Sequence, residues 1–132
     1  MGNTIKKRLK IMIIEDEEDI LILYNDYLSS RAHQVVNKYP SADTILTDIE
    51  KEPPDVYLID YRLPENKNGI DVAIEILSMY PSASIVFITA FELLDREISK
   101  HGIFYDKNID VLIKPVKLND IENSILNLVN KK

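Results

Sequence analysis

The 132-residue sequence contains no cysteine, which excludes a disulfide framework, a thiolate metal site and a cysteine nucleophile. No apolar stretch approaches the length of a membrane span, and the N-terminus lacks the apolar core of a signal peptide. Myristoylation is not predicted, because Met1-Gly2 is followed by Lys6 where that motif requires serine or threonine. These absences predict a cytoplasmic protein without membrane insertion.

An excess of positive charge is also lacking. The chain has 16 basic and 22 acidic residues and a formal net charge of −6, which argues against nucleic acid as a partner. The one basic run lies near the start, and we interpret residues 1–8 as a solvated lead-in. The apolar fraction of 45% is that of a globular protein, and the length predicts one domain at residues 9–132, with no output domain.

Short apolar runs alternate with segments of helical periodicity through the rest of the chain. The runs predict strands at residues 9–14, 34–38, 56–60, 85–89 and 111–113. Five strands alternating with five helices predict an α/β fold whose parallel sheet is covered on both faces. Right-handed crossovers leave few topologies, and the simplest is the flavodoxin-like (βα)5 doubly wound sheet with strand order 2-1-3-4-5.

The helices are predicted from their apolar stripes and end signals. The first begins near Glu17 and buries six residues: Ile20, Leu21, Leu23, Tyr24, Tyr27 and Leu28. The second begins at Ser41 as N-cap and stops before Pro53-Pro54. The third begins near Gly69 and the fifth near Leu118. The fourth spans residues 92–100, with Gly102 as its C′ glycine.

Polar side chains follow four of the predicted strands. Glu15-Asp16 follows the first, Asp60 ends the third, Thr89 ends the fourth and Lys114-Pro115 follows the fifth. Because the carboxyl ends of parallel strands meet at one edge of a sheet, these side chains are expected in one crevice. Three carboxylates, one hydroxyl and one ammonium group would share it.

The three carboxylates would repel one another in a common site unless a counter-charge is present. All-oxygen ligation suits Mg²⁺, with Mn²⁺ or Ca²⁺ as alternatives. A simpler interpretation is that residues 15–19 form an acidic helix start favoured by the macrodipole. That interpretation accounts for residues 17–19 but does not explain why Asp60 also follows an apolar strand.

The remaining polar groups fit phosphoryl chemistry. Lys114 alone would be interpreted as a surface lysine, but beside three acids it neutralises charge and can hold a phosphoryl oxygen. Thr89 either bonds its own backbone or bonds such an oxygen. Asp60 is the predicted nucleophile, since a carboxylate attacks phosphorus and a metal ion with a lysine stabilises the transition state. Pro115 is a candidate for a cis peptide bond.

Four motifs resemble those of CheY-like response-regulator receiver domains. They are Ile13-Ile14-Glu15-Asp16-Glu17, Leu58-Ile59-Asp60-Tyr61-Arg62-Leu63-Pro64, Ile88-Thr89-Ala90 and Ile113-Lys114-Pro115. The resemblance implies a stand-alone receiver of a two-component or phosphorelay system. Asp60 would then be the phosphoacceptor, and Mg²⁺ would be held by Glu15, Asp16, Asp60 and the backbone carbonyl of Arg62.

The same resemblance assigns phosphoryl binding and switching to Thr89, Ala90 and Lys114. It implies a sensor histidine kinase or phosphotransfer protein as donor, and a downstream target bound at the helix 4–strand 5–helix 5 face. It implies a monomer or weak homodimer, and no catalysis beyond the domain's own phosphorylation and dephosphorylation. Arg62 and Phe91 occupy positions that tune the lifetime of the phosphoryl group in the family.

One position departs from the family pattern. Val111 stands where the family usually has the aromatic residue that swings inward on activation. Phe104 or Tyr105 would either take its place or close the hydrophobic edge.

Three other classes of function are compatible with an α/β fold of this kind. A nucleotide or flavin module requires a loop of backbone N–H groups after the first strand, where this chain has acids. A phosphohydrolase requires a second acid two residues after the nucleophile, where this chain has Arg62. A pseudo-receiver, a protein-interaction module independent of phosphorylation, is the alternative left open by Val111.

Overall fold

Five parallel strands form the centre of the structure, a computed structural model that describes residues 8–38, 53–63 and 68–130. The elements in chain order are β1 (Lys10–Ile14), α1 (Glu18–Ser30), β2 (Gln34–Lys38), β3 (Val56–Asp60), α3 (Gly69–Met79), β4 (Ser84–Thr89), α4 (Leu94–Ser99), the 3₁₀ helix η1 (Gly102–Phe104), β5 (Asn108–Ile113) and α5 (Leu118–Asn130). The helix predicted from Ser41 and most of the basic lead-in lie outside the described residues.

The strand order is β2-β1-β3-β4-β5, and every neighbouring pair is parallel. This confirms the predicted flavodoxin-like sheet and its order. All residues of β3 and β4 are buried, as their continuous apolar runs indicate for strands covered on both faces. β5 lies at the edge of the sheet and is only partly buried.

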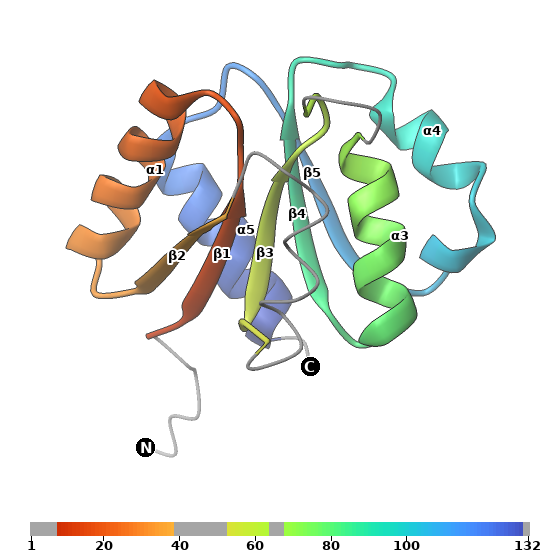
Figure 1. The fold of residues 1–132 in the computed structure, drawn as a ribbon, viewed down its shortest axis with the longest axis horizontal. Helices are drawn as coiled ribbons and strands as arrows, with labels where there is room; N and C mark the ends of the chain where they lie inside the picture. Colours follow the sequence, from red (N-terminus) through yellow and green to blue (C-terminus); the bar gives the residue numbers. More distant parts are fainter. Residues whose placement is uncertain (1–7, 39–52, 64–67, 131–132) are drawn as a thin grey trace.

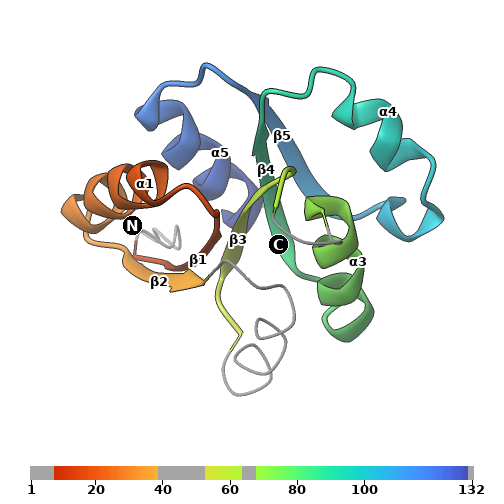
Figure 2. The ribbon, with the colours of Figure 1, turned by 45° about the horizontal axis from the view of Figure 1, so that its top comes forward.

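Helices cover the sheet on both sides (Figures 1 and 2). α1 and α5 pack on one face, where Leu28 and Ile125 are buried among residues of β1, β3 and β4. α3 and the buried Leu94 of α4 pack on the other face, together with Phe104 of η1. Successive strand residues point to opposite faces, so each central strand contributes to both cores. None of the described helices has the length and apolar character needed to cross a membrane.

Two details of the predicted helices were wrong. Leu23 was placed on the buried stripe of α1 but is 51% exposed, because only Leu21, Tyr24 and Leu28 face the sheet fully. The fourth helix begins at Leu94 rather than residue 92. Phe91 and Leu94 form a turn first, with the Leu94 N–H donating to the Phe91 carbonyl, and the burial of Leu94 then sets where the helix starts.

Gly102 was predicted as a C′ glycine, and this was also wrong. No described glycine has a positive φ, and Gly102 is the first residue of η1. The chain keeps turning after α4 because η1 brings Phe104 into the core, where its ring meets Phe87 edge to face at 6.4 Å. The chain after α4 is therefore shaped by the burial of Phe104 and not by a glycine cap at Gly102.

Candidate functional site

The carboxyl ends of β1 and β3 bring three acidic side chains together. Glu15 and Asp16 follow β1, and Asp60 is the last residue of β3, its direct neighbour in the sheet. One carboxylate oxygen from each of the three lies within 4.8 Å of the others. Glu15 is 2% exposed and Asp60 is 8% exposed, whereas Asp16 is exposed to solvent. The predicted convergence of these acids is therefore present in the fold.

A pocket of about 280 Å³ opens beside these acids, and we call it the acidic pocket. The residues that line it are Asp16, Glu17, Asp60, Arg62, Thr89, Ala90 and Lys114. They come from the ends of β1, β3, β4 and β5, four strands that are consecutive in the sheet. The backbone also joins two of these ends, because the Lys114 N–H donates to the Thr89 carbonyl at 2.8 Å. One edge of the sheet thus supplies carboxylate, hydroxyl and ammonium groups to one space.

Burial and mutual repulsion make the acids of this site reluctant to ionise. Burial raises the pKa of Glu15 to about 7, and the nearby Asp60 carboxylate adds to the rise. A hydrogen bond from the Glu17 N–H to Glu15 Oε2, 3.0 Å long, opposes it. Burial likewise raises the pKa of Asp60, opposed by the Lys114 charge and by a hydrogen bond from the Arg62 N–H. The cluster lacks sufficient positive charge of its own.

The donor atoms of the cluster suit a hard divalent cation. All the candidate side-chain ligands are carboxylates, and Mg²⁺ is usually held by one or two carboxylates together with water. A cation would favour the ionised forms of Glu15 and Asp60, whose pKa values are raised first by burial and then by neighbouring acids. Asp16 faces solvent, which leaves room for bound water. The site is therefore compatible with Mg²⁺, and with Mn²⁺ as the alternative.

Thr89 is buried at the edge of the acidic pocket, with 1% of its surface exposed. Its Oγ1 accepts a hydrogen bond from the Phe91 N–H at 3.0 Å. Of the two interpretations left open for Thr89, the bond to its own backbone is thus present. The second remains available, since a hydroxyl that accepts one hydrogen bond still has its own proton to donate.

Phe91 was expected, from the resemblance, to flank the pocket and to tune the lifetime of the phosphoryl group. The structure instead stacks its ring on Tyr61, with centroids 5.1 Å apart and an interplanar angle of 23°. Phe91 is not among the residues that line the acidic pocket, whereas Arg62 and Ala90 are. Phe91 therefore lies beside the site and is connected to it through Thr89.

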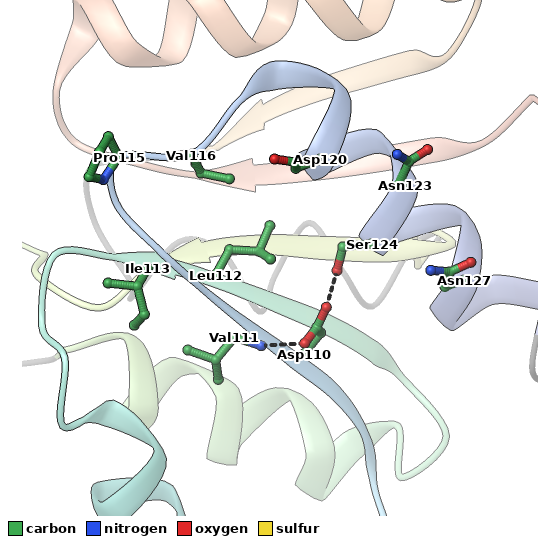
Figure 3. Close-up of a pocket in the computed structure, with 10 residues that line it drawn as sticks. All are labelled: Asp110, Val111, Leu112, Ile113, Pro115, Val116, Asp120, Asn123, Ser124 and Asn127. Atoms are coloured by element: carbon green, nitrogen blue, oxygen red, sulfur yellow. Dashed lines mark hydrogen bonds between the residues drawn. The ribbon is translucent and has the colours of Figure 1, made fainter.

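Val111, which replaces the usual aromatic residue, also lies outside the acidic pocket. It borders a groove of about 440 Å³ between β5 and α5 (Figure 3). In that groove Asp110 accepts hydrogen bonds from the Val111 N–H and from the Ser124 hydroxyl. Phe104 is buried in the hydrophobic core cluster against which Val111 also packs, whereas Tyr105 is 86% exposed.

The peptide bond between Lys114 and Pro115 is cis. It lies directly after β5, at the point where the chain turns from the sheet towards α5. Pro115 was the candidate for such a bond.

Three residues near the site were not singled out from the sequence. Glu17 lines the acidic pocket, although its charge was attributed to the helix macrodipole. Tyr61 carries the ring that stacks on Phe91. Gly69 begins α3 so close to β3 that a Cβ there would lie 2.5 Å from the Asp60 carbonyl oxygen. A third acid after the strand-end pair was a usable signal for Glu17, but nothing in the sequence indicated the other two contacts.

The model of the response regulator receiver domain family matches residues 11–126, and the chain belongs to that family. The family consists of signalling domains of two-component systems, not of classical enzymes, and phosphorylation and Mg²⁺ are typical of it.

Two curated relatives are 27% and 29% identical to this chain over the matched residues. The luminescence regulatory protein LuxO of Vibrio campbellii is 27% identical over 121 residues, which are 90% of this chain and 25% of LuxO. LuxO of Vibrio cholerae is 29% identical over 121 residues, with the same coverage. The chain thus spans about a quarter of the length of these relatives.

Solved structures agree with the fold. A receiver domain protein from Clostridium thermocellum has a TM-score of 0.77 and 28% identity, and the match covers 92% of this chain and 94% of that one. The receiver domain of a LuxO repressor protein from Vibrio parahaemolyticus has a TM-score of 0.78 at 21% identity, covering 94% and 92%. Both are receiver domains, which confirms the flavodoxin-like fold class.

Proposed function

We propose that this domain accepts a phosphoryl group on Asp60 and thereby acts as a signalling switch. The observation that supports this most directly is the composition of the acidic pocket. Asp60 lies in it beside Lys114 and Thr89, with Glu15 and Asp16 close enough to share a cation. A carboxylate, an ammonium group and a hydroxyl in one small space are what an acyl-phosphate site requires.

In the proposed reaction a carboxylate oxygen of Asp60 attacks the phosphorus atom of the donor and forms a new P–O bond. The bond between phosphorus and the donor's leaving group breaks, and that group leaves with the bonding electron pair. Lys114 compensates negative charge on the phosphoryl oxygens as a point charge. The Thr89 hydroxyl and the backbone beside Ala90 border the space that these oxygens would occupy.

Glu15, Asp16, Asp60 and the backbone carbonyl of Arg62 are the groups that would hold Mg²⁺. When bound, the cation supplies positive charge that screens the carboxylates and the incoming phosphoryl group. The raised pKa values of Glu15 and Asp60 support this assignment, because buried carboxylates that also lie near other acids gain from an added positive charge.

We propose a sensor histidine kinase or a phosphotransfer protein as the natural donor. The downstream partner would bind the face formed by α4, β5 and α5. β5 is the edge strand of the sheet on that side, and the groove beside it has carboxylate, carboxamide and apolar groups (Figure 3). LuxO, whose receiver-like part this chain matches, is named a regulatory protein, which is consistent with signalling through a partner.

Incubation with acetyl phosphate, followed by intact mass measurement, tests the proposal. We expect a phosphoryl adduct on the wild type in the presence of Mg²⁺ and none when the metal is chelated. Asp60→Asn should abolish the adduct. Asp106→Asn is the matched control: Asp106 is exposed and has φ 60, a conformation that asparagine also tolerates, and this variant should be phosphorylated normally.

An adduct on Asp60→Asn would show that another residue is the acceptor. If the wild type forms no adduct with Mg²⁺ or Mn²⁺, from acetyl phosphate or from a phosphorylated histidine kinase, the proposal is overturned. The chain would then be a pseudo-receiver that acts through protein contacts alone.

A further inference from the structure

The segments that leave β3 and β4 are joined by a pair of aromatic rings. Tyr61 directly follows Asp60, and Phe91 is the second residue after Thr89. β3 and β4 are paired in the sheet, with Asp60 opposite Ile88, so the two segments emerge side by side. Their rings stack with centroids 5.1 Å apart and an interplanar angle of 23°. The stack therefore connects the strand end that carries the acceptor to the strand end that carries the hydroxyl.

The same pair is connected to the hydroxyl of Thr89. The Phe91 N–H donates to Thr89 Oγ1 at 3.0 Å, which determines where this oxygen lies. Because the oxygen accepts that hydrogen bond, its own proton is free to point elsewhere. Thr89 is 1% exposed and borders the acidic pocket with Asp60 and Lys114, so the pocket is the polar direction open to that proton.

Both rings are also held in place by the hydrophobic core. Tyr61 and Phe91 are partly buried and pack against the apolar cluster that lies between the sheet and α3. Offset stacking is a preferred geometry of aromatic pairs, so it restricts the backbone of each residue as well as its ring. A restricted Phe91 backbone holds the N–H that bonds Thr89. Val111 supplies no ring from β5, whereas Phe91 carries both a stacked ring and the N–H that bonds Thr89.

We propose that Tyr61 and Phe91 are positioning residues, whose stacked rings hold the Thr89 hydroxyl in place to donate to a phosphoryl oxygen on Asp60. The proposal rests on Asp60 being the acceptor. Phe91 does not line the acidic pocket, so its effect passes through Thr89 and not through direct contact with the phosphoryl group. A hydroxyl placed in advance stabilises the developing negative charge without reorganisation at the moment of reaction.

The test compares rates of adduct formation from acetyl phosphate in Mg²⁺, measured by intact mass. Phe91→Leu and Tyr61→Leu each remove the stack and keep the backbone N–H. Because a small misplacement of a reacting group costs up to about 100-fold in rate, we expect a loss on the order of tenfold for each. Phe91→Tyr and Tyr61→Phe keep the two rings and should react at about the wild-type rate. Mg²⁺ affinity, measured separately by calorimetry, should stay within about twofold, because the acids are untouched.

Combination with Thr89→Ala separates positioning from a general structural effect. If the stack acts only through the Thr89 hydroxyl, Phe91→Leu should slow the wild type but should not slow Thr89→Ala further. The double variant Tyr61→Leu/Phe91→Leu should be no slower than either single variant. Tyr105→Leu is the matched control, since its ring is 86% exposed, and it should react at the wild-type rate.

The role of Asp60 and the role of the Tyr61–Phe91 stack are overturned by different results. A wild type that forms no adduct from any donor overturns the function of Asp60 itself. A wild type that is phosphorylated normally, with Phe91→Leu at the same rate, overturns only the role of the stack. The role of the stack is also overturned if Phe91→Leu and Thr89→Ala slow the reaction independently, or if Phe91→Tyr fails to restore the rate.

Discussion

Two groups of buried carboxylates in this molecule have opposite surroundings. Glu122 of α5, 7% exposed, accepts hydrogen bonds from Arg31 Nε and His33 Nε2, each 2.9 Å long. The Leu9 N–H donates to His33 Nδ1, so the proton on that ring lies on Nε2 and points to Glu122. At the acidic pocket, Glu15 and Asp60 are equally buried, but they face each other and Asp16.

This difference in surroundings indicates a structural role for Glu122 and a ligand-binding role for the acids of the pocket. The Glu122 cluster joins the residue before β1, the loop after α1 and the first half of α5, and both carboxylate oxygens of Glu122 and both ring nitrogens of His33 are hydrogen-bonded. The Glu122 carboxylate therefore stabilises the folded protein without an added ligand. In the pocket, burial and then the neighbouring carboxylates raise the pKa values of Glu15 and Asp60, and the opposing effects of Lys114 and the backbone hydrogen bonds do not cancel the rise. A bound cation would supply the counter-charge that these two acids lack.

The largest effect is expected from breaking the satisfied cluster. Glu122→Ala leaves the buried His33 N–H without an acceptor, and His33 has a fully buried side chain. We expect the free energy of unfolding to fall by about 3 kcal/mol, since an unsatisfied buried donor adds to the lost packing. Urea denaturation at neutral pH measures this change. A loss below about 0.5 kcal/mol would show that the cluster contributes little to stability.

The next effect comes from the close approach of backbone behind Asp60. A Cβ at Gly69 would lie 2.5 Å from the Asp60 carbonyl oxygen and 2.8 Å from Tyr61 Cα, both backbone atoms that cannot rotate away. We expect Gly69→Ala to destabilise the fold by about 2 kcal/mol and to weaken Mg²⁺ binding. Thermal unfolding and a calorimetric titration provide the two readouts.

Gly102→Ala is the matched control for that substitution. No atom lies within 4 Å of a Cβ at Gly102, and its φ is not positive. This variant should be as stable as the wild type or more stable by about 0.5 kcal/mol, through a less flexible unfolded chain. Equal losses in the two glycine variants would contradict the role of close approach at Gly69.

The stability of the protein should depend on pH through the buried acids of the acidic pocket. The pKa of Glu15 is raised from an ordinary 4.5 to about 7 in the folded protein, which therefore binds its proton more tightly than the unfolded chain does. The contribution of Glu15 to stability is complete below its ordinary pKa and is lost as the pH rises through about 7. The raised pKa of Asp60 acts in the same direction.

Urea unfolding of metal-free protein at about pH 5 and about pH 7.5 measures this loss, expected on the order of 1 kcal/mol. Glu15→Gln removes the titrating group and should reduce the difference between the two pH values. Saturating Mg²⁺ should stabilise the wild type more at the higher pH, where the carboxylates are ionised and free to bind it. A pH dependence that is the same in wild type and Glu15→Gln would assign the loss to other groups.

The smallest effect is expected at an exposed ion pair, where neither burial nor a shared site is involved. Lys100 Nζ lies 2.7 Å from Glu97 Oε2, and the lysine side chain is 67% exposed. Lys100→Ala should change the free energy of unfolding by about 0.3 kcal/mol, and less in high salt. A loss above about 1 kcal/mol would indicate that this pair belongs to a larger network.

Much of the fold could be predicted because hydrophobic patterning and strand-end chemistry are local in the sequence. The continuous apolar runs before Asp60 and Thr89 correctly predicted central strands and the edge at which the polar groups meet. The errors occurred where packing between distant segments decided the outcome. The start of α4 follows the burial of Leu94, and the turn at Gly102 follows the burial of Phe104.

The class of fold, the strand order and the set of polar residues at one edge of the sheet could be predicted from the order of residues alone. These follow from period-2 and period-3.6 apolar patterns and from the few topologies open to alternating strands and helices. The stack of Tyr61 on Phe91, the approach of Gly69 to Asp60 and the pairing of His33 with Glu122 could be seen only in the folded chain. These contacts depend on how closely separate segments pack in three dimensions. Patterns along the sequence do not encode such packing distances.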